Sequence, residues 1–167
     1  MKRFFSVLII FIFLFSACST NKDKELFNSA SAKAKAKNYT GAFKDYQKII
    51  DEYSSSDNAA ESIFAIAAMY HMYQIPNLSK EESLKKAVIY YRKLFEQFPK
   101  NEKAAKALFM SAFIEANELN QLEQAKKFYQ TFLEKFPDHE LASQAKIELD
   151  NLGKTPEEMF MNRTAKK

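Results

Sequence analysis

One pattern of small and large apolar residues occurs three times along the chain. Each copy starts with an alanine, large apolar residues follow at offsets of four, seven and eleven, and a residue that favours a helix end stands at offset twelve. The copies are Ala42, Tyr46, Ile49, Tyr53 and Ser54; Ala87, Tyr91, Leu94, Phe98 and Pro99; and Ala125, Tyr129, Phe132, Phe136 and Pro137. Such offsets put the side chains on one stripe of a helix, and the alanine lets a second helix approach closely. The pattern predicts an all-α chain of helical hairpins.

The stretches around these copies also have helical periodicity. Ala59, Ile63, Phe64 and Ala67 follow the first copy much as Ala104, Leu108, Phe109 and Ala112 follow the second. Only two glycines interrupt the chain, and Gly153 is placed to end a helix. We therefore expect helices at 24–37, 40–53, 58–73, 80–98, 101–119, 121–136 and 138–152, with a further short helix proposed at 156–163.

The three copies resemble the tetratricopeptide repeat. That family has a small residue, an aromatic residue four positions later and a closing proline twelve positions later, and Ser54 replaces the proline in the first copy. The resemblance implies a right-handed superhelical stack of helix-turn-helix hairpins over 24–152, with about three repeats and a C-terminal capping helix. Residues 153–167 would form a tail.

The N-terminus has the order of charges and apolar residues that is typical of a secretory signal. Lys2 and Arg3 come first, residues 4–15 are almost entirely apolar, and Ser16 and Ala17 precede Cys18. The apolar run is shorter than the roughly 20 residues that a membrane span requires. A cleaved signal is therefore expected at 1–17.

The sequence Phe15-Ser16-Ala17-Cys18 resembles the lipobox of bacterial lipoproteins, although Phe15 stands where leucine is usual. The resemblance implies a covalent lipid on Cys18, a lipid-anchored tether at 18–23 and, because Ser19 rather than aspartate follows, sorting to the outer membrane. The alternatives are an ordinary signal with an incidental cysteine, or an uncleaved anchor.

Few residues in the chain suit catalysis or cofactor binding. Two glycines cannot form a Gly-rich phosphate loop, and one cysteine with two histidines argues against a disulfide framework or a metal site. His71 lies in a nearly apolar stretch and is expected to pack or lie at a rim, whereas His139 is expected at the surface. The formal charge of +4 falls further when Lys2 and Arg3 leave with the signal, so nucleic acid is not an expected partner. We expect no enzymatic activity and no cofactor besides the lipid.

In tetratricopeptide repeats the first helix of each pair lines a groove that binds peptides or proteins. By that resemblance the candidate groove residues are Met69, Tyr70, Tyr73, Met110, Phe113, Ile114 and Asn117. The alternative for each of them is packing between neighbouring hairpins.

Among lipoproteins of this type, the chain resembles the BamD family of outer-membrane assembly lipoproteins. The resemblance rests on Cys18, on Phe98-Pro99 and Phe136-Pro137, and on the segments 140–142 and 148–153. It implies a periplasm-facing scaffold that binds components of outer-membrane β-barrel assembly. A general envelope scaffold of the Tol-Pal or peptidoglycan type and a periplasmic enzyme are the alternatives.

Overall fold

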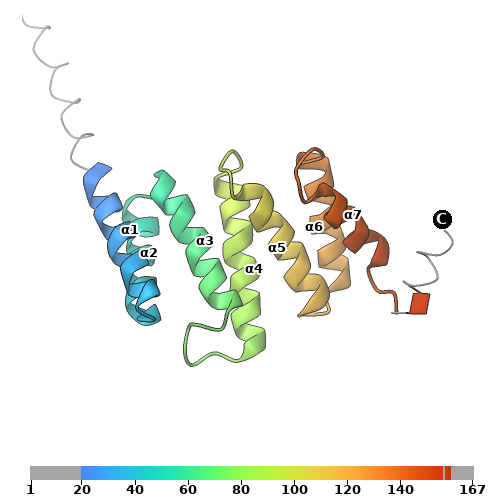
Figure 1. Cartoon of the computed structure of the whole chain (residues 1–167), viewed down its shortest axis with the longest axis horizontal. Coiled ribbons are helices and arrows are strands. Elements are labelled where there is room, and N and C mark those ends of the chain that lie inside the picture. The colour runs from blue at the N-terminus through green and yellow to red at the C-terminus, as the bar shows by residue number, and fades with distance from the viewer. Residues whose placement is uncertain (1–19, 156, 159–167) are drawn as a thin grey trace, which may run out of the picture. The chain divides into compact units, whose positions relative to one another are not determined.

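A computed structural model describes residues 20–155, 157 and 158, and this part of the chain is all-α (Figure 1). Its seven helices follow one another as sequential hairpins. They are α1 (Thr20–Lys35), α2 (Tyr39–Glu52), α3 (Asp57–His71), α4 (Lys80–Gln97), α5 (Ala104–Asn117), α6 (Leu122–Lys135) and α7 (Ala142–Asn151). Within the described residues, no helix is both long and apolar enough to cross a bilayer. The expected signal at 1–17, Cys18 and most of the expected helix at 156–163 lie outside them.

The chain divides into two compact units, and the boundary falls between Ser62 and Ile63, inside α3. In the first unit, α1 packs along α2. Asp23 in the first turn of α1 is buried and accepts a hydrogen bond from Asn58 Nδ2 at 3.0 Å, so the start of α1 is joined to the start of α3.

In the second unit, α5 packs against both α4 and α6, and α6 packs against α7. The C-terminal half of α3 lies on α4: the Phe64 and Tyr91 rings meet edge to face at 5.4 Å, and Ser83 Oγ donates to the Tyr70 carbonyl at 2.6 Å. A core formed by α5, α6 and α7 contains Leu108, Phe109, Ala125, Tyr129, Phe132 and Ala145.

The threefold stripe is confirmed in the interior. Ala42, Ala87 and Ala125 are fully buried, as are the residues seven positions after each alanine, and the tyrosines four positions after are at most 4% exposed. The third large residue in each copy, Tyr53, Phe98 or Phe136, is the C-cap of its helix, and its N–H donates to the carbonyl four residues earlier. The stripe therefore both packs the hairpin and marks where its second helix ends.

Some helix ends differ from the expected ones. Helix α1 begins at Thr20, inside the stretch 18–23 that was expected to be a tether, because Asp23 is hydrogen-bonded in its first turn. Helix α5 begins at Ala104 rather than 101, since Asn101 Oδ1 accepts from the Lys103 N–H at 2.8 Å and forms a turn first. Helix α7 begins at Ala142 rather than 138, because His139 Nδ1 accepts from the Leu141 N–H in the same way, at 3.1 Å.

The longest connection in the second unit lies between α3 and α4. Ser79 ends it with a capping box: its hydroxyl accepts from the Glu82 N–H at 3.2 Å, and the Glu82 carboxylate accepts from the Ser79 N–H at 2.8 Å. The Ser79 hydroxyl also donates to the Glu82 carboxylate at 2.7 Å, and this bond, with the one from the Ser79 N–H, holds the pKa of that carboxyl below its usual value. The connection therefore ends at a well-defined helix start, which places Lys80 and Glu81 beside the end of α3.

Candidate protein-binding face

The structure divides the seven candidate groove residues into two groups. Met69, Tyr70 and Ile114 are buried, with at most 6% of their surface exposed, so their side chains belong to the interior. Met110 and Phe113 are half-buried, Asn117 is exposed, and Tyr73 is 44% exposed. For the three buried residues the packing alternative holds, and for the other four partner binding stays a prediction.

Packing against α4 accounts for the burial of Tyr70. Its ring lies 5.6 Å from the ring of Tyr90 on α4, and its backbone carbonyl accepts the Ser83 hydroxyl. Burial raises the pKa of the Tyr70 phenol. Tyr70 thus packs on α4, and exposure increases sharply just after the last residue of α3, where Met72 is 64% exposed.

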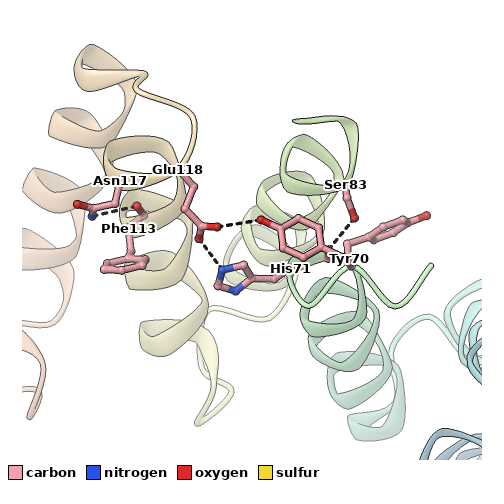
Figure 2. A network of polar contacts seen from close by, with 7 residues as sticks. Tyr70, His71, Ser83, Phe113, Asn117 and Glu118 are labelled. Carbon is pink, nitrogen blue, oxygen red and sulfur yellow. Dashed lines mark hydrogen bonds and ion pairs between the residues drawn. The ribbon is translucent and has the colours of Figure 1, made fainter. Parts of the chain in front are cut away.

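A polar network joins the end of α3 to the end of α5 (Figure 2). One oxygen of the Glu118 carboxylate lies 2.6 Å from His71 Nε2, and the other accepts the Tyr73 hydroxyl at 3.2 Å. The His71 ring also meets the ring of Tyr91 edge to face at 6.4 Å. Glu118, the C-cap of α5, therefore connects to the last residue of α3, His71, and to Tyr73 just after it.

Tyr73 has an unusual backbone and a polar environment. Its φ of 55° is in the left-handed region, which directs the chain out of α3 immediately after His71. Partial desolvation, and then the Glu118 carboxylate, raise the pKa of the phenol, so it stays protonated and donates. Lys80 Nζ lies over the ring, 5.9 Å from its centre. These residues, with Glu81, Leu84 and Leu119, line a recess of about 440 Å³.

The outer face of α5 continues from this network. Phe113 and Met110 pack partly against the core of α5, α6 and α7, so only part of each side chain is accessible. Asn117 Nδ2 donates to the Phe113 carbonyl at 3.2 Å, which leaves its amide oxygen available (Figure 2). This face offers both apolar contact and a hydrogen-bond acceptor at the surface.

A second recess, of about 500 Å³, lies between the end of α5, the start of α6 and α7. Several of its lining residues carry carboxamides: Asn117, Asn120, Gln144 and Asn151. Ile147 contributes an apolar side chain that is 45% exposed. Asn117 is the one candidate from the sequence that lies at this recess.

Sequence reasoning missed Glu118, Lys80 and the polar residues of α7. Glu118 stands just past an apolar helix, where an acidic residue is usually solvated, and nothing local indicates its partner 47 residues earlier. The residues of α7 carry a weak signal, since Gln144, Ile147 and Asn151 recur at spacings of three and four and share a helix face.

Other chemistry is scarce in the described part of the chain. Within it, no cluster of three or more histidine, cysteine, aspartate or glutamate residues is arranged to hold a metal ion. His139, the second histidine, contacts the rings of Phe132 and Phe136 and caps the turn before α7. Cys18, the expected lipid attachment site, lies outside the described residues.

Comparison with known proteins supports the repeat assignment. Residues 26–56 and 106–139 each match the family model of the tetratricopeptide repeat. The first match covers most of α1 and all of α2, and the second covers most of α5 and all of α6. No curated protein matches the chain significantly. The sequential hairpins and buried alanine stripes are consistent with this repeat, and over these two segments the chain is similar to tetratricopeptide-repeat proteins.

Proposed function

We propose that this protein is a lipid-anchored scaffold that faces the periplasm and binds protein partners in outer-membrane protein assembly. Its repeats favour protein–protein interaction in general. The observation that carries the proposal is the exposed end of α3 beside α5, where Met72 and Tyr73 are accessible and Glu118 holds the two helices together. Exposed apolar side chains that are rimmed by polar groups are typical of interaction sites.

Binding rather than catalysis is the mode of action that we propose. Glu118 engages the Nε2 atom of His71, and an aromatic ring packs against the imidazole. A histidine held in this way suits a structural link between two helices better than a proton transfer to a substrate. The mechanism is then the presentation of a preformed surface, whose geometry the hairpins fix before a partner arrives.

The proposed anchor is the covalent lipid on Cys18. One acyl chain holds a protein only marginally at a bilayer, whereas two or more give stable attachment, at ~0.8 kcal/mol for each buried CH2 group. The apolar leader that ends at Cys18 supports this proposal. We expect Cys18→Ser to move the protein from the membrane fraction to the soluble fraction while its circular dichroism is unchanged. Retention of this variant in the membrane would contradict lipid anchoring.

The assembly role is tested by site-specific photo-cross-linking in living cells. A photoreactive residue at Met72 samples the proposed face, and one at Ile89 on α4 is the matched control, because these side chains are 64% and 58% exposed. We expect position 72, and not position 89, to yield a cross-link to a β-barrel assembly component. Cross-links to Tol-Pal components or peptidoglycan enzymes would instead favour a general envelope scaffold.

A further inference from the structure

The outer face of α4 differs from those of α2 and α6 at one position of the repeat. Two residues after the repeat alanine, α2 has Lys44 and α6 has Lys127, and both lysines are exposed. In α4 the same position is Ile89, which is 58% exposed. A single exposed isoleucine is common on protein surfaces, so the residues around it decide whether it has a role.

Four basic residues surround Ile89 on the same face of α4. They stand three or four positions before and after it, the spacings that bring side chains together on a helix, and they are Lys85, Lys86, Arg92 and Lys93. In α6 the corresponding residues carry no positive charge: they are Glu123, Gln124, Gln130 and Thr131. The outer face of α4 therefore has an apolar centre and a basic border, whereas that of α6 has a lysine at its centre.

Two of the four cations are paired with acidic residues of α4 itself. Lys85 Nζ lies 2.6 Å from a Glu81 carboxylate oxygen, and an Arg92 guanidinium nitrogen lies 3.1 Å from one of Glu96. The third acidic residue of the helix, Glu82, belongs to the capping box. The net positive charge of the face therefore comes from the other two basic residues.

Those two residues, Lys86 and Lys93, each lie over a tyrosine ring. Lys86 Nζ is 5.8 Å from the ring centre of Tyr70, and Lys93 Nζ is 5.9 Å from that of Tyr90. The two rings are 5.6 Å apart, and Tyr70 is buried. Cation–π contacts with rings that are held in this way position both ammonium groups before any ligand arrives.

An anionic lipid surface fits this face better than a protein does. Helices that lie in the headgroup region of a membrane combine an apolar centre with lysines, whose stems reach outward to the phosphates. One exposed isoleucine supplies too little apolar area for a stable protein interface, which buries about 800 Å² of each partner. A second copy of the chain is disfavoured, because two such faces would bring their cations together.

We propose that the outer face of α4 docks on an anionic membrane surface, with Ile89 among the headgroups and Lys86 and Lys93 against lipid phosphates. The inference rests on the proposed function, because a lipid on Cys18 keeps the chain at a bilayer, where a weak second contact is effective. The face alone binds weakly and reversibly, so the Cys18→Ser variant still leaves the membrane fraction. Docking determines which side of the second unit faces the membrane.

The test uses the absence of tryptophan from the sequence, since one introduced tryptophan then reports only its own surroundings. Ile89→Trp places it on the proposed face, and Lys127→Trp places it at the same repeat position of α6 as the matched control. The full chain is reconstituted in vesicles of phosphatidylcholine with brominated acyl chains, with or without one third phosphatidylglycerol.

We expect bromine to quench the tryptophan at position 89 in the anionic vesicles and not in the neutral ones, and to quench it less at high salt. The tryptophan at position 127 should stay unquenched in both. Equal quenching at the two positions, or none at position 89, would overturn the inference.

Charge variants identify the residues that hold the face to lipid. In the Ile89→Trp chain, Lys86→Gln with Lys93→Gln removes the two positioned cations, and Lys126→Gln with Lys135→Gln removes two exposed lysines of α6 as the control. We expect the first pair to lower the ratio of docked to undocked protein about fivefold for each charge removed, and the control pair to leave it nearly unchanged. Equal losses would show that overall charge, and not this face, attracts the chain.

The same quenching experiment on the Cys18→Ser chain, at high vesicle concentration, separates this inference from the proposed anchor. Selective quenching at position 89 supports the α4 face whether or not Cys18 carries a lipid. A lipid-carrying chain that shows no such quenching overturns the face and leaves the anchor standing. In cells, a cross-link from position 89 to an acidic protein would also overturn the inference, because it would identify a protein as the occupant.

Discussion

The hairpins α1–α2 and α5–α6 have the same repeat register and are closed by different interactions. In α1–α2, Asp45 on α2 accepts from Lys33 at 2.5 Å and from Ser29 at 2.7 Å, both on α1. In α5–α6, Phe109 on α5 lies 5.8 Å from each of two rings on α6, those of Tyr129 and Phe132. The first hairpin also has one such ring pair, Phe27 with Tyr46 at 5.6 Å.

The difference shows which part of the repeat is obligatory. The buried alanine and the apolar positions at offsets four and seven occur in both hairpins. The interactions around these positions differ: they are a charged link in α1–α2 and an aromatic cluster in α5–α6. We therefore expect α5–α6 to be sensitive to lost side-chain volume, and α1–α2 to be sensitive to pH and salt. Hydrogen exchange, read separately for each hairpin, distinguishes the two.

The largest effect is expected from Phe132→Ala. The side chain is fully buried and contacts Phe109, Phe136 and His139, so its removal leaves a cavity that costs about 3–5 kcal/mol. Hydrogen exchange should accelerate in α5 and α6. The matched change in the other hairpin is Ile49→Ala, at a residue that is also fully buried but is not aromatic, with an expected cost of about 2–4 kcal/mol. If Ile49→Ala costs more stability than Phe132→Ala, aromatic packing does not make α5–α6 the hairpin that is more sensitive to lost volume.

The shared register is tested by enlarging the alanines. Ala42→Leu and Ala125→Leu each force a larger side chain between two helices where the alanine is fully buried, and each should cost about 1–3 kcal/mol. Thermal unfolding measures both. Ala36→Leu, at an exposed alanine just after α1, is the control. If either buried variant unfolds like the control, the register is wrong for that hairpin.

Acid should weaken α1–α2 selectively. Hydrogen bonding by Asn58 lowers the pKa of Asp23, and bonds from Lys33 and Ser29 outweigh burial to lower that of Asp45. The stability that these groups contribute is present above the ordinary value of 3.8 and is lost as the pH falls through their lower folded values. The expected loss is on the order of 1 kcal/mol.

Glu115 on α5 makes the opposite contribution to the pH dependence of stability. Burial raises its pKa above 4.5, so the charged form opposes folding at neutral pH, and protonation on mild acidification relieves that cost. Hydrogen exchange at pH 6 and at a pH well below 3.8, corrected for the intrinsic rates, should show a loss of protection in α1–α2 before α5–α6. An equal loss of protection in both hairpins would show that the contacts of Asp23 and Asp45 do not make α1–α2 the more acid-sensitive hairpin.

The smallest effect is expected from salt. The Lys33–Asp45 pair is partly exposed, with 38% and 17% of the two side chains accessible, so Lys33→Met should cost about 0.2–1 kcal/mol. High salt should weaken the parent protein slightly and leave this variant unchanged. Chemical denaturation at low and high ionic strength measures both. Matching salt responses would show that the pair contributes nothing.

The sequence predicted much of the fold, and for identifiable reasons. Alanine, aromatic and proline positions at fixed offsets determine which faces pack and where α2, α4 and α6 end, because these are local properties of a helix. It also predicted that Gly153 ends the last helix, and the residue has a φ of 76° there. The starts of α5 and α7 were missed, since side-chain caps at Asn101 and His139 form a turn before the helix begins.

The proposed binding face was predictable only in part. The pattern placed the candidate residues on α3 and α5, where binding stays a prediction, and it did not distinguish Met72, which is exposed, from Met69, which is buried one turn earlier. Both stand in one apolar stretch of the sequence, but Met69 lies within α3 and Met72 directly follows its last residue. The local pattern does not encode this difference in burial, which depends on tertiary packing.

By itself, then, the sequence determined the helical hairpins, their repeat register and the residues that close each pair, because periodicity and small residues act over a few turns of chain. The tertiary structure alone decided which apolar side chains remain accessible. It also brought His71 to Glu118 across 47 residues and gathered carboxamides from α5, α7 and an intervening turn into one recess. Such contacts depend on how neighbouring helices pack in space, and no local pattern of residues encodes them.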